Sequence, residues 1–365
     1  MRIPHLSAPS VAAVFAISGA IAALPASAQT AATDRFFILP YLGSAPETGI
    51  QYGGTVFRVH QPTDSSTRPS TAQLFASYTA RHQARAFVEL DRWSAGSDWH
   101  IVSRAEWQRF PLPFYGFGDR APESAEEFYT PTAFIASALV QRRVAGPLYL
   151  LGGYSVQKSR ITNTAPDGAL GHGAVFGDSG GVLTLLQVGA LWDDRNDVFA
   201  PTSGNFAQLT ESYSIGALGS DYTFRRFVGD ARHFLPLGSG RVLAMQGVVE
   251  MTGGRTPFDQ LSLVGNSNYL RGYTRGRFRD RDLIAAQAEY RAPLVHRLGW
   301  AVFGGAGRIA AQPLDLLARD TRTLPTYGIG ARWTLFSASR SDIRVDYARA
   351  GDGQSGIYVA LNEAF

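Results

Sequence analysis

Apolar and polar residues alternate along most of this sequence, which is the pattern of β-strands with one face toward a hydrophobic environment. The clearest example runs from Tyr327 to Leu335, where Tyr, Ile, Ala, Trp and Leu alternate with Gly, Gly, Arg and Thr. Similar alternation is present in 243–251, 284–291 and 343–348. A soluble β-sandwich could produce any one of these segments. Many of them, joined by turns rich in Asp, Asn and Gly, favour a barrel.

Sixteen segments can be counted, and single-chain bacterial barrels have even strand numbers. We therefore predict an all-β fold, a transmembrane antiparallel β-barrel of about 16 strands. The first segment contains Pro40, and proline within a strand indicates an edge or a closing seam. The predicted strands are 36–42, 49–60, 71–80, 83–92, 98–110, 130–144, 148–158, 180–193, 204–216, 221–235, 240–252, 282–293, 298–309, 325–336, 342–349 and 356–365.

The N-terminus has the pattern of a secretory signal peptide. An apolar run from Val11 to Leu24 follows Arg2, and Ala26-Ser27-Ala28 has the small residues of a cleavage site. The run is short for a spanning helix, which needs about 18 residues. We expect 1–28 to be a signal peptide and 29–365 to be the barrel. An N-terminal anchor helix is the alternative.

Composition excludes several functions. The sequence has no cysteine, so it can form neither disulfides nor thiolate metal sites. Its net charge is +4, but the arginines are scattered, and secretion argues against a nucleic-acid partner. The charge suits a polar lumen or contact with outer-membrane lipid and lipopolysaccharide. The histidines lack metal-ligand spacing, so we expect no metal and no cofactor.

One segment resembles the surroundings of a protease nucleophile. Gly177-Asp178-Ser179-Gly180-Gly181 copies the sequence around the serine of trypsin-like proteases. That chemistry needs a histidine base oriented by an acid, together with an oxyanion hole, and the usual histidine segment is absent. We expect no catalytic residues, and we expect that the protein is not an enzyme.

Two long gaps interrupt the strand pattern, near 161–179 and 254–281. Long loops in compact folds are usually functional or disordered. The second gap is unusual because its arginines lie among glycines. They are Arg255, Arg271, Arg275, Arg277, Arg279 and Arg281.

Within this second gap, Leu270-Arg271-Gly272-Tyr273 resembles the [V/L]-R-G-[F/Y] tetrad of the BamA/TamA-type assembly factors, the bacterial surface antigen family. The resemblance implies that 254–281 is an arginine-bearing loop folded into the barrel. In the family, lumenal acids hold the tetrad arginine. Alternation places Glu289 on the lumenal face, where it can serve Arg271.

A second motif lies upstream. The segment 191–204 looks like the family's D-x-R-(D/N)-x-x-F-x-P-x-x-G hairpin, carried here by Asp193, Arg195, Pro201 and Gly204. Proline and glycine at these positions set the shape of a polar turn that follows a strand. Together with family-like segments near 38–49 and 114–119, the resemblance covers essentially the whole mature chain.

The sequence departs from the family pattern in two ways. Relatives such as BamA carry periplasmic POTRA domains before the barrel, and we expect none here. Gly305 stands where the family has an acid on the strand after that of Glu289. An unpaired charge inside a protein costs several kcal/mol. We therefore expect Asp346, or water, to replace the missing acid beside Arg271.

The end of the sequence resembles the signal of a terminal barrel strand. Phe365 follows the apolar residues Ile357, Val359 and Leu361, although Glu363 interrupts the pattern. We expect Pro40 and Phe365 to mark a weak seam between first and last strands. A separate periplasmic subunit could complete such a machine.

The resemblance implies insertion or translocation of client outer-membrane or secreted proteins at the bacterial outer membrane. An open seam could template a client strand. The alternative is a passive pore or a structural, surface-antigen barrel.

Overall fold

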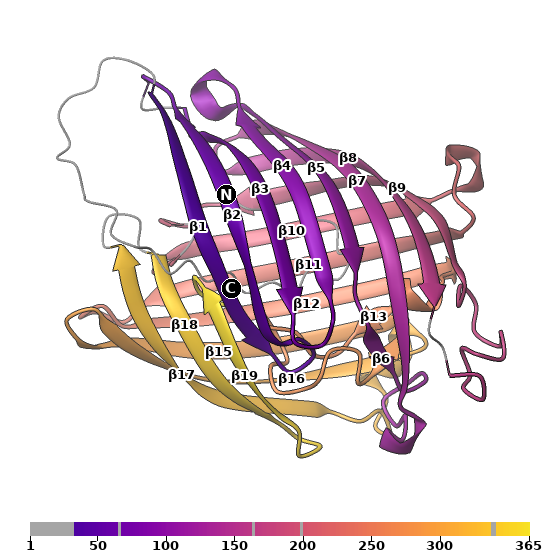
Figure 1. Cartoon of the computed structure of the whole chain (residues 1–365). Helices are drawn as coiled ribbons and strands as arrows, with labels where there is room; N and C mark the ends of the chain where they lie inside the picture. Colours follow the sequence, from indigo (N-terminus) through magenta and orange to yellow (C-terminus); the bar gives the residue numbers. More distant parts are fainter. Residues whose placement is uncertain (1–32, 65–66, 163–164, 198–199, 337–340) are drawn as a thin grey trace.

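The computed structural model describes residues 33–64, 67–162, 165–197, 200–336 and 341–365. The expected signal peptide, 1–28, lies outside the described residues. The strands join edge to edge in one antiparallel sheet that closes into a barrel (Figure 1). Among the described residues, no helix is long and apolar enough to cross a membrane.

The sheet contains seventeen strands. Because β5 and β6 both pair with β7 and follow each other along it, they form one strand of the wall, and the barrel has sixteen. The predicted fold and strand number are confirmed. The wall strands are β1 (Thr33–Ala45), β2 (Gly49–Gln61), β3 (Ser70–Thr79), β4 (Ala84–Trp93), β5 (Trp99–Arg109) with β6 (Leu112–Phe114), β7 (Glu127–Ala145), β8 (Leu148–Thr162), β9 (Gly180–Asp193), β10 (Gly204–Ser214), β11 (Thr223–Pro236), β12 (Val242–Arg255), β15 (Asp282–Val295), β16 (Leu298–Ala310), β17 (Leu324–Phe336), β18 (Ser341–Ala350) and β19 (Ser355–Leu361).

Alternation gives the wall two different faces. On β17, Tyr327, Ile329 and Trp333 are 58%, 55% and 52% exposed, whereas Arg332 is buried. Large exposed apolar side chains of this kind recur on strands all around the barrel. A continuous apolar outer face with polar residues inside is the arrangement of barrels that contact lipid.

The connections at the two ends of the barrel differ in length. Both described ends of the chain lie at one end, where β7–β8 and β15–β16 turn within two residues. The other end carries the long connections, among them 163–179 and 256–281. Five 3-10 turns lie in connections. They are η1 (Ala95–Ser97), η2 (Glu123–Ala125), η3 (Gly216–Leu218), η4 (Phe258–Gln260) and η5 (Pro313–Leu317).

The prediction that the last strand runs to Phe365 is wrong. β19 ends at Leu361, and Asn362 adopts a positive φ of 63° that turns the backbone away from the strand. Phe365 is buried, and it packs with Phe234 of β11 and with Val242 and Ala244 of β12.

Ion pairs explain why the chain leaves the strand. Glu363 accepts from Arg332 Nε at 2.8 Å and lies 3.5 Å from Arg291 Nε. Arg291 also donates to the Phe365 carbonyl at 3.1 Å. A carboxylate is more stable beside these arginines than on an apolar strand face, which favours the inward turn of the segment.

Candidate functional site

The segment 256–281, between β12 and β15, packs against the side of the wall opposite the exposed apolar residues. It contains η4 and the short pair β13 (Ser262–Leu263) and β14 (Arg279–Asp280). Leu270 and Tyr273 are almost fully buried in an apolar cluster with side chains from β15 to β18. The cluster consists of Val264, Leu270, Tyr273, Phe278, Leu283, Ala285, Ile309, Leu324 and Ala350.

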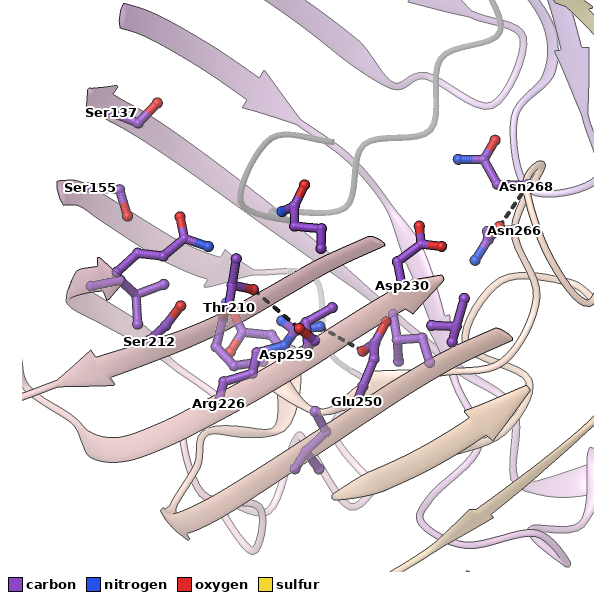
Figure 2. Close-up of a pocket in the computed structure, with 18 of the residues that line it drawn as sticks. Ser137, Ser155, Thr210, Ser212, Arg226, Asp230, Glu250, Asp259, Asn266 and Asn268 are labelled. Carbon is purple, nitrogen blue, oxygen red and sulfur yellow. Dashed lines mark hydrogen bonds and ion pairs between the residues drawn. The ribbon is translucent and has the colours of Figure 1, made fainter. Parts of the chain in front are cut away.

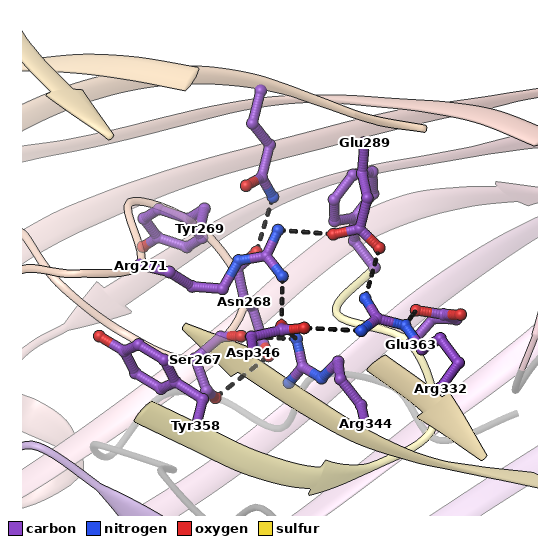
Figure 3. A network of polar contacts seen from close by, with 12 residues as sticks. Ser267, Asn268, Tyr269, Arg271, Glu289, Arg332, Arg344, Asp346, Tyr358 and Glu363 are labelled. Atoms are coloured by element: carbon purple, nitrogen blue, oxygen red, sulfur yellow. Dashed lines mark hydrogen bonds and ion pairs between the residues drawn. The ribbon is translucent and has the colours of Figure 1, made fainter. Parts of the chain in front are cut away.

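Arg271 is completely buried between two carboxylates (Figure 3). Its Nη2 donates to Glu289 Oε2 at 2.6 Å, and its Nη1 donates to Asp346 Oδ2 at 2.5 Å. The guanidinium carbon lies 3.4 Å from the centre of the Phe303 ring. Hydrogen bonds between charged groups are stronger than neutral ones, and an aromatic face adds a cation–π attraction. The structure thus brings together Arg271 and the two acids that the sequence offered for it.

Three further arginines share these carboxylates. Arg332 donates to Glu289 at 2.8 Å and to Asp346 at 2.6 Å. Arg291 donates to Glu289 at 2.9 Å, and Arg344 donates to Asp346 at 3.2 Å. Each carboxylate therefore contacts three arginines. Because each carboxylate is shared by arginines from several segments, the network holds these segments together.

The backbone of the tetrad is also anchored, mainly to the last hairpin of the barrel. Gly272 N donates to Tyr358 Oη of β19 at 2.8 Å, and Thr274 N donates to Gln354 Oε1 at 2.8 Å. The Arg271 carbonyl accepts from Thr326 Oγ1. Gly272 has a φ of 109°, and a Cβ there would lie 2.8 Å from the Ala350 nitrogen. Only glycine fits this conformation and this close approach.

Two inward-facing glycines shape the wall beneath the network. At Gly305, where the family has an acid, a Cβ would lie 2.6 Å from the Ala286 carbonyl oxygen, so no side chain fits. At Gly330 a Cβ would collide with the Asp346 carboxylate and the Arg332 guanidinium. Gly330 and Asp346 face each other across the β17–β18 pair. The glycine on one strand thus provides the space for the acid on the next.

The hairpin motif lies at the other end of the barrel, in the β9–β10 connection. Arg195 Nε and Nη2 donate to Asp193 at 2.8 and 3.0 Å, and the guanidinium carbon lies 4.7 Å from the centre of the Phe206 ring. Gly204 has a φ of 100°, and a Cβ there would lie 2.8 Å from the Arg195 Cα. Pro201 is buried in the same turn. Val198 and Phe199 lie outside the described residues. The structure therefore does not bring this motif to the tetrad.

A cavity of about 230 Å³, with polar and apolar side chains in its lining, lies between segment 256–281 and the wall from β4 to β12 (Figure 2). Asn266 and Asn268 line it from the segment, and Arg226 and Glu250 line it from the wall. Arg226 donates to Glu250 at 2.7 Å, and Tyr269 Oη donates to the other oxygen of Glu250 at 2.7 Å. In the part of the chain that the structure describes, no three acidic or histidine side chains are placed to hold a metal ion.

The pairings of β1 with its two neighbouring strands differ greatly in length. β1 pairs with β2 along its whole length, from Thr33 opposite Gln61 to Ala45 opposite Gly49. With β19 it has a single residue pair, Ser44 opposite Val359. Among the described residues, no strand pairs with the part of β1 that contains Pro40 on that side, whereas Phe365 lies elsewhere, against β11 and β12.

Sequence reasoning missed Arg332, Arg344 and Tyr358. Alternation did place both arginines on the inward face of their strands, and that was the available signal.

No curated protein sequence matches the chain. The Omp85 superfamily domain matches residues 68–365.

Three solved structures are similar in fold. For BamA from Haemophilus ducreyi lacking POTRA domains 1–3, the TM-score is 0.63 at 14% identity, covering 92% of this chain and 70% of that chain. For CdiB from Acinetobacter baumannii, the TM-score is 0.58 at 10% identity, covering 91% of this chain and 65% of that chain. For CdiB from Escherichia coli, the TM-score is 0.62 at 10% identity, covering 89% of this chain and 62% of that chain. The chain thus spans slightly less than two thirds of either CdiB chain.

Proposed function

The chain belongs to the Omp85 superfamily, and from this premise we propose that it inserts or translocates other proteins at the bacterial outer membrane by opening between β1 and β19. Its partners would be outer-membrane lipid and lipopolysaccharide, client outer-membrane or secreted proteins and, if client capture requires one, a separate periplasmic subunit. The long connections would face outward and the short turns the periplasm, as in other bacterial barrels.

The single pair that joins β1 to β19 carries this proposal. Antiparallel strands are held by the ladder of backbone hydrogen bonds between them. Seven residues of β19 pair with β18, but only Val359 is paired with β1. The β1–β19 joint therefore costs the least to open, and opening it leaves every other joint intact.

The unpaired edge of β1 can accept a strand. Ala45 N donates to Thr48 Oγ1, and the Ala45 carbonyl accepts from Thr48 N, so the peptide groups of Ala45 point toward β2. Because these groups alternate along a strand, those of Ile38, Pro40 and Leu42 point toward the seam. A client strand could pair there by β-augmentation. Pro40 has no N–H, so the edge lacks one donor, as expected of an edge strand.

Segment 256–281 would act as the inward-folded loop of this machine. Arg271 ties it to β15 and β18, and Gly272 ties it to β19. The loop is thus attached to the C-terminal side of the seam, the side of β19. When the seam opens, we expect the loop and strands β15 to β19 to move as one body, away from β1.

A disulfide across the seam tests the proposal. The chain has no cysteine, so the pair Ser44→Cys and Val359→Cys would form the only disulfide. Its matched control is Ala331→Cys with Val345→Cys across β17–β18, where ten residue pairs join the strands. We expect the seam disulfide to abolish client insertion into vesicles, with recovery on reduction, and the control to have no effect. Full insertion with the seam locked would refute the proposal.

The cavity between the segment and the opposite wall favours one alternative, a passive pore. A pore would conduct in large steady steps, and conductance would not depend on the seam. A barrel filled by its own loop would show low, fluctuating conductance. Planar-bilayer recordings of the seam-locked variant distinguish them, because locking would suppress fluctuations only in the second case.

A further inference from the structure

The connection between β16 and β17, residues 311–323, carries the most exposed large apolar side chain in the described part of the chain. Leu314 is 82% exposed and Leu317 is 76% exposed, whereas Leu316 between them is buried. All three lie in η5. Side chains three residues apart lie on the same side of a 3-10 helix, so Leu314 and Leu317 form one apolar surface.

Arg308 shows on which side of the wall η5 lies. On β16, Phe303 and Ile309 are buried inside, whereas Val302 is 40% exposed. The even-numbered residues, including Arg308, therefore face outward.

The Arg308 side chain reaches the connection from that outer face. Its Nη1 donates to the carbonyls of Leu316 and Ala318 at 3.1 and 3.2 Å, and its Nε donates to Thr323 Oγ1 at 2.9 Å. This outward-facing side chain thus holds the connection at three points, one of them the Leu316 carbonyl in η5, and it places η5 on the outer side of the barrel.

The apolar outer face of the wall reaches the same level. Ile284 of β15 lies directly opposite Arg308 and is 41% exposed on the outer face. The leucine pair thus adjoins the surface that contacts lipid, and it extends that surface beyond the strand ends. An exposed apolar patch that continues a lipid-facing surface indicates a contact with the membrane.

We propose that η5 is a membrane anchor whose Leu314 and Leu317 insert among the acyl chains of the leaflet at the long-connection end. This inference rests on the proposed membrane location. The anchor would fix the β15–β17 wall, which carries Glu289 and contacts the loop, at one depth in the bilayer. Opening of the seam would then be a displacement of the loop and strands β15 to β19 relative to β1 within the plane of the membrane, without a change in depth.

Single-cysteine labelling tests the anchor, since the chain supplies no background thiol. Leu314→Cys and Leu317→Cys would each carry a polarity-sensitive fluorophore in vesicles containing nitroxide-labelled phospholipid. Ile329→Cys, on the outer face of β17, is the lipid-facing control, and Asp320→Cys, exposed in the same connection, is the aqueous control. Heat-modifiable migration on gels would verify that each labelled protein is folded.

We expect nitroxide lipid to lower the fluorescence at 314 and 317 about twofold or more, as at 329, because an interfacial anchor is buried ~5–10 Å into the headgroup and acyl boundary. The label at 320 should stay bright and be quenched by aqueous iodide. Labels at 314 and 317 quenched only by iodide would overturn the anchor. So would labels shielded from both quenchers, which would indicate a second copy or a protein partner. Failure at 329 as well would instead overturn the membrane location.

Discussion

Two clusters of arginines and carboxylates line the inside of this barrel, on different parts of the wall. On β4 and β5, Arg85 and Arg104 pair with Glu106, and Arg104 also pairs with Glu89. These residues belong to adjacent strands, and Arg85, Arg104 and Glu106 border the cavity. Charges that border a cavity need fewer protein partners, because water in the cavity can complete their hydrogen bonds.

The second cluster, around Glu289 and Asp346, is different because one of its arginines comes from outside the wall. Arg271 lies 18 residues from Glu289 and 75 from Asp346 along the chain. The same chemistry therefore has two uses. Between neighbouring strands it places paired charges beside the cavity, and with a loop arginine it ties a long connection to three strands of the wall, β15, β17 and β18.

Removing one acid from each cluster should give the largest difference. Glu289→Gln removes the negative charge that Arg271, Arg291 and Arg332 share in a buried site. This loss should lower the free energy of unfolding by about 3–5 kcal/mol. Glu106→Gln borders the cavity and should cost about 1.5 kcal/mol, the lower value for hydrogen bonds to charged groups. Urea unfolding in vesicles, followed by heat-modifiable migration, measures both. Equal losses would mean that the two clusters do not differ in function.

Detaching the loop backbone should have the next largest effect. Gly272→Ala places a methyl group in a strained conformation and against the Ala350 nitrogen, at a cost of about 2–3 kcal/mol. Gly353→Ala is the matched control, because Gly353 has a similar φ of 96° and nothing near its Cβ position. The control should show only the strain, about 1 kcal/mol.

Protease sensitivity would show whether the loop itself is released by Gly272→Ala. We expect cleavage within 256–281 in this variant and not in Gly353→Ala, while the β4–β5 cluster stays intact. Identical behaviour of the two variants would show that the close approach of Gly272 to Ala350 has no role in docking.

The sequence was sufficient to predict the barrel and three members of the second cluster. The family resemblance singled out Arg271 in the loop, and alternation placed Glu289 and Asp346 on the inward face of their strands. It could not place Arg332 beside them, because that depends on the register between strands. Register is set by turn geometry and by cross-strand packing, which a single sequence does not display.

The end of the chain shows the same limit more sharply. Glu363 was visible as a break in an apolar pattern, yet the pattern was extended through it to Phe365. The acid is stabilised by Arg291 and Arg332, which come from strands far away in the sequence. The alternation pattern shows that Glu363 does not suit an apolar strand face. It does not show the arginines that make the inward turn favourable, because their positions depend on the fold.

The smallest expected effect comes from the space that Gly330 leaves for the Asp346–Arg332 pair. Gly330→Ala adds a methyl group where those side chains meet, and the pair would have to shift, at about 1–2 kcal/mol. Gly247→Ala on β12 is the control, because nothing lies near its Cβ position and its stability should stay within about 0.5 kcal/mol of the parent.

Combining Gly330→Ala with Glu289→Gln sharpens the test, since the stability losses from substitutions within one network do not add. If Gly330 acts by shaping the network, the double variant should lose less than the sum of the two single losses. Strict additivity would mean that the glycine matters only for packing of the wall.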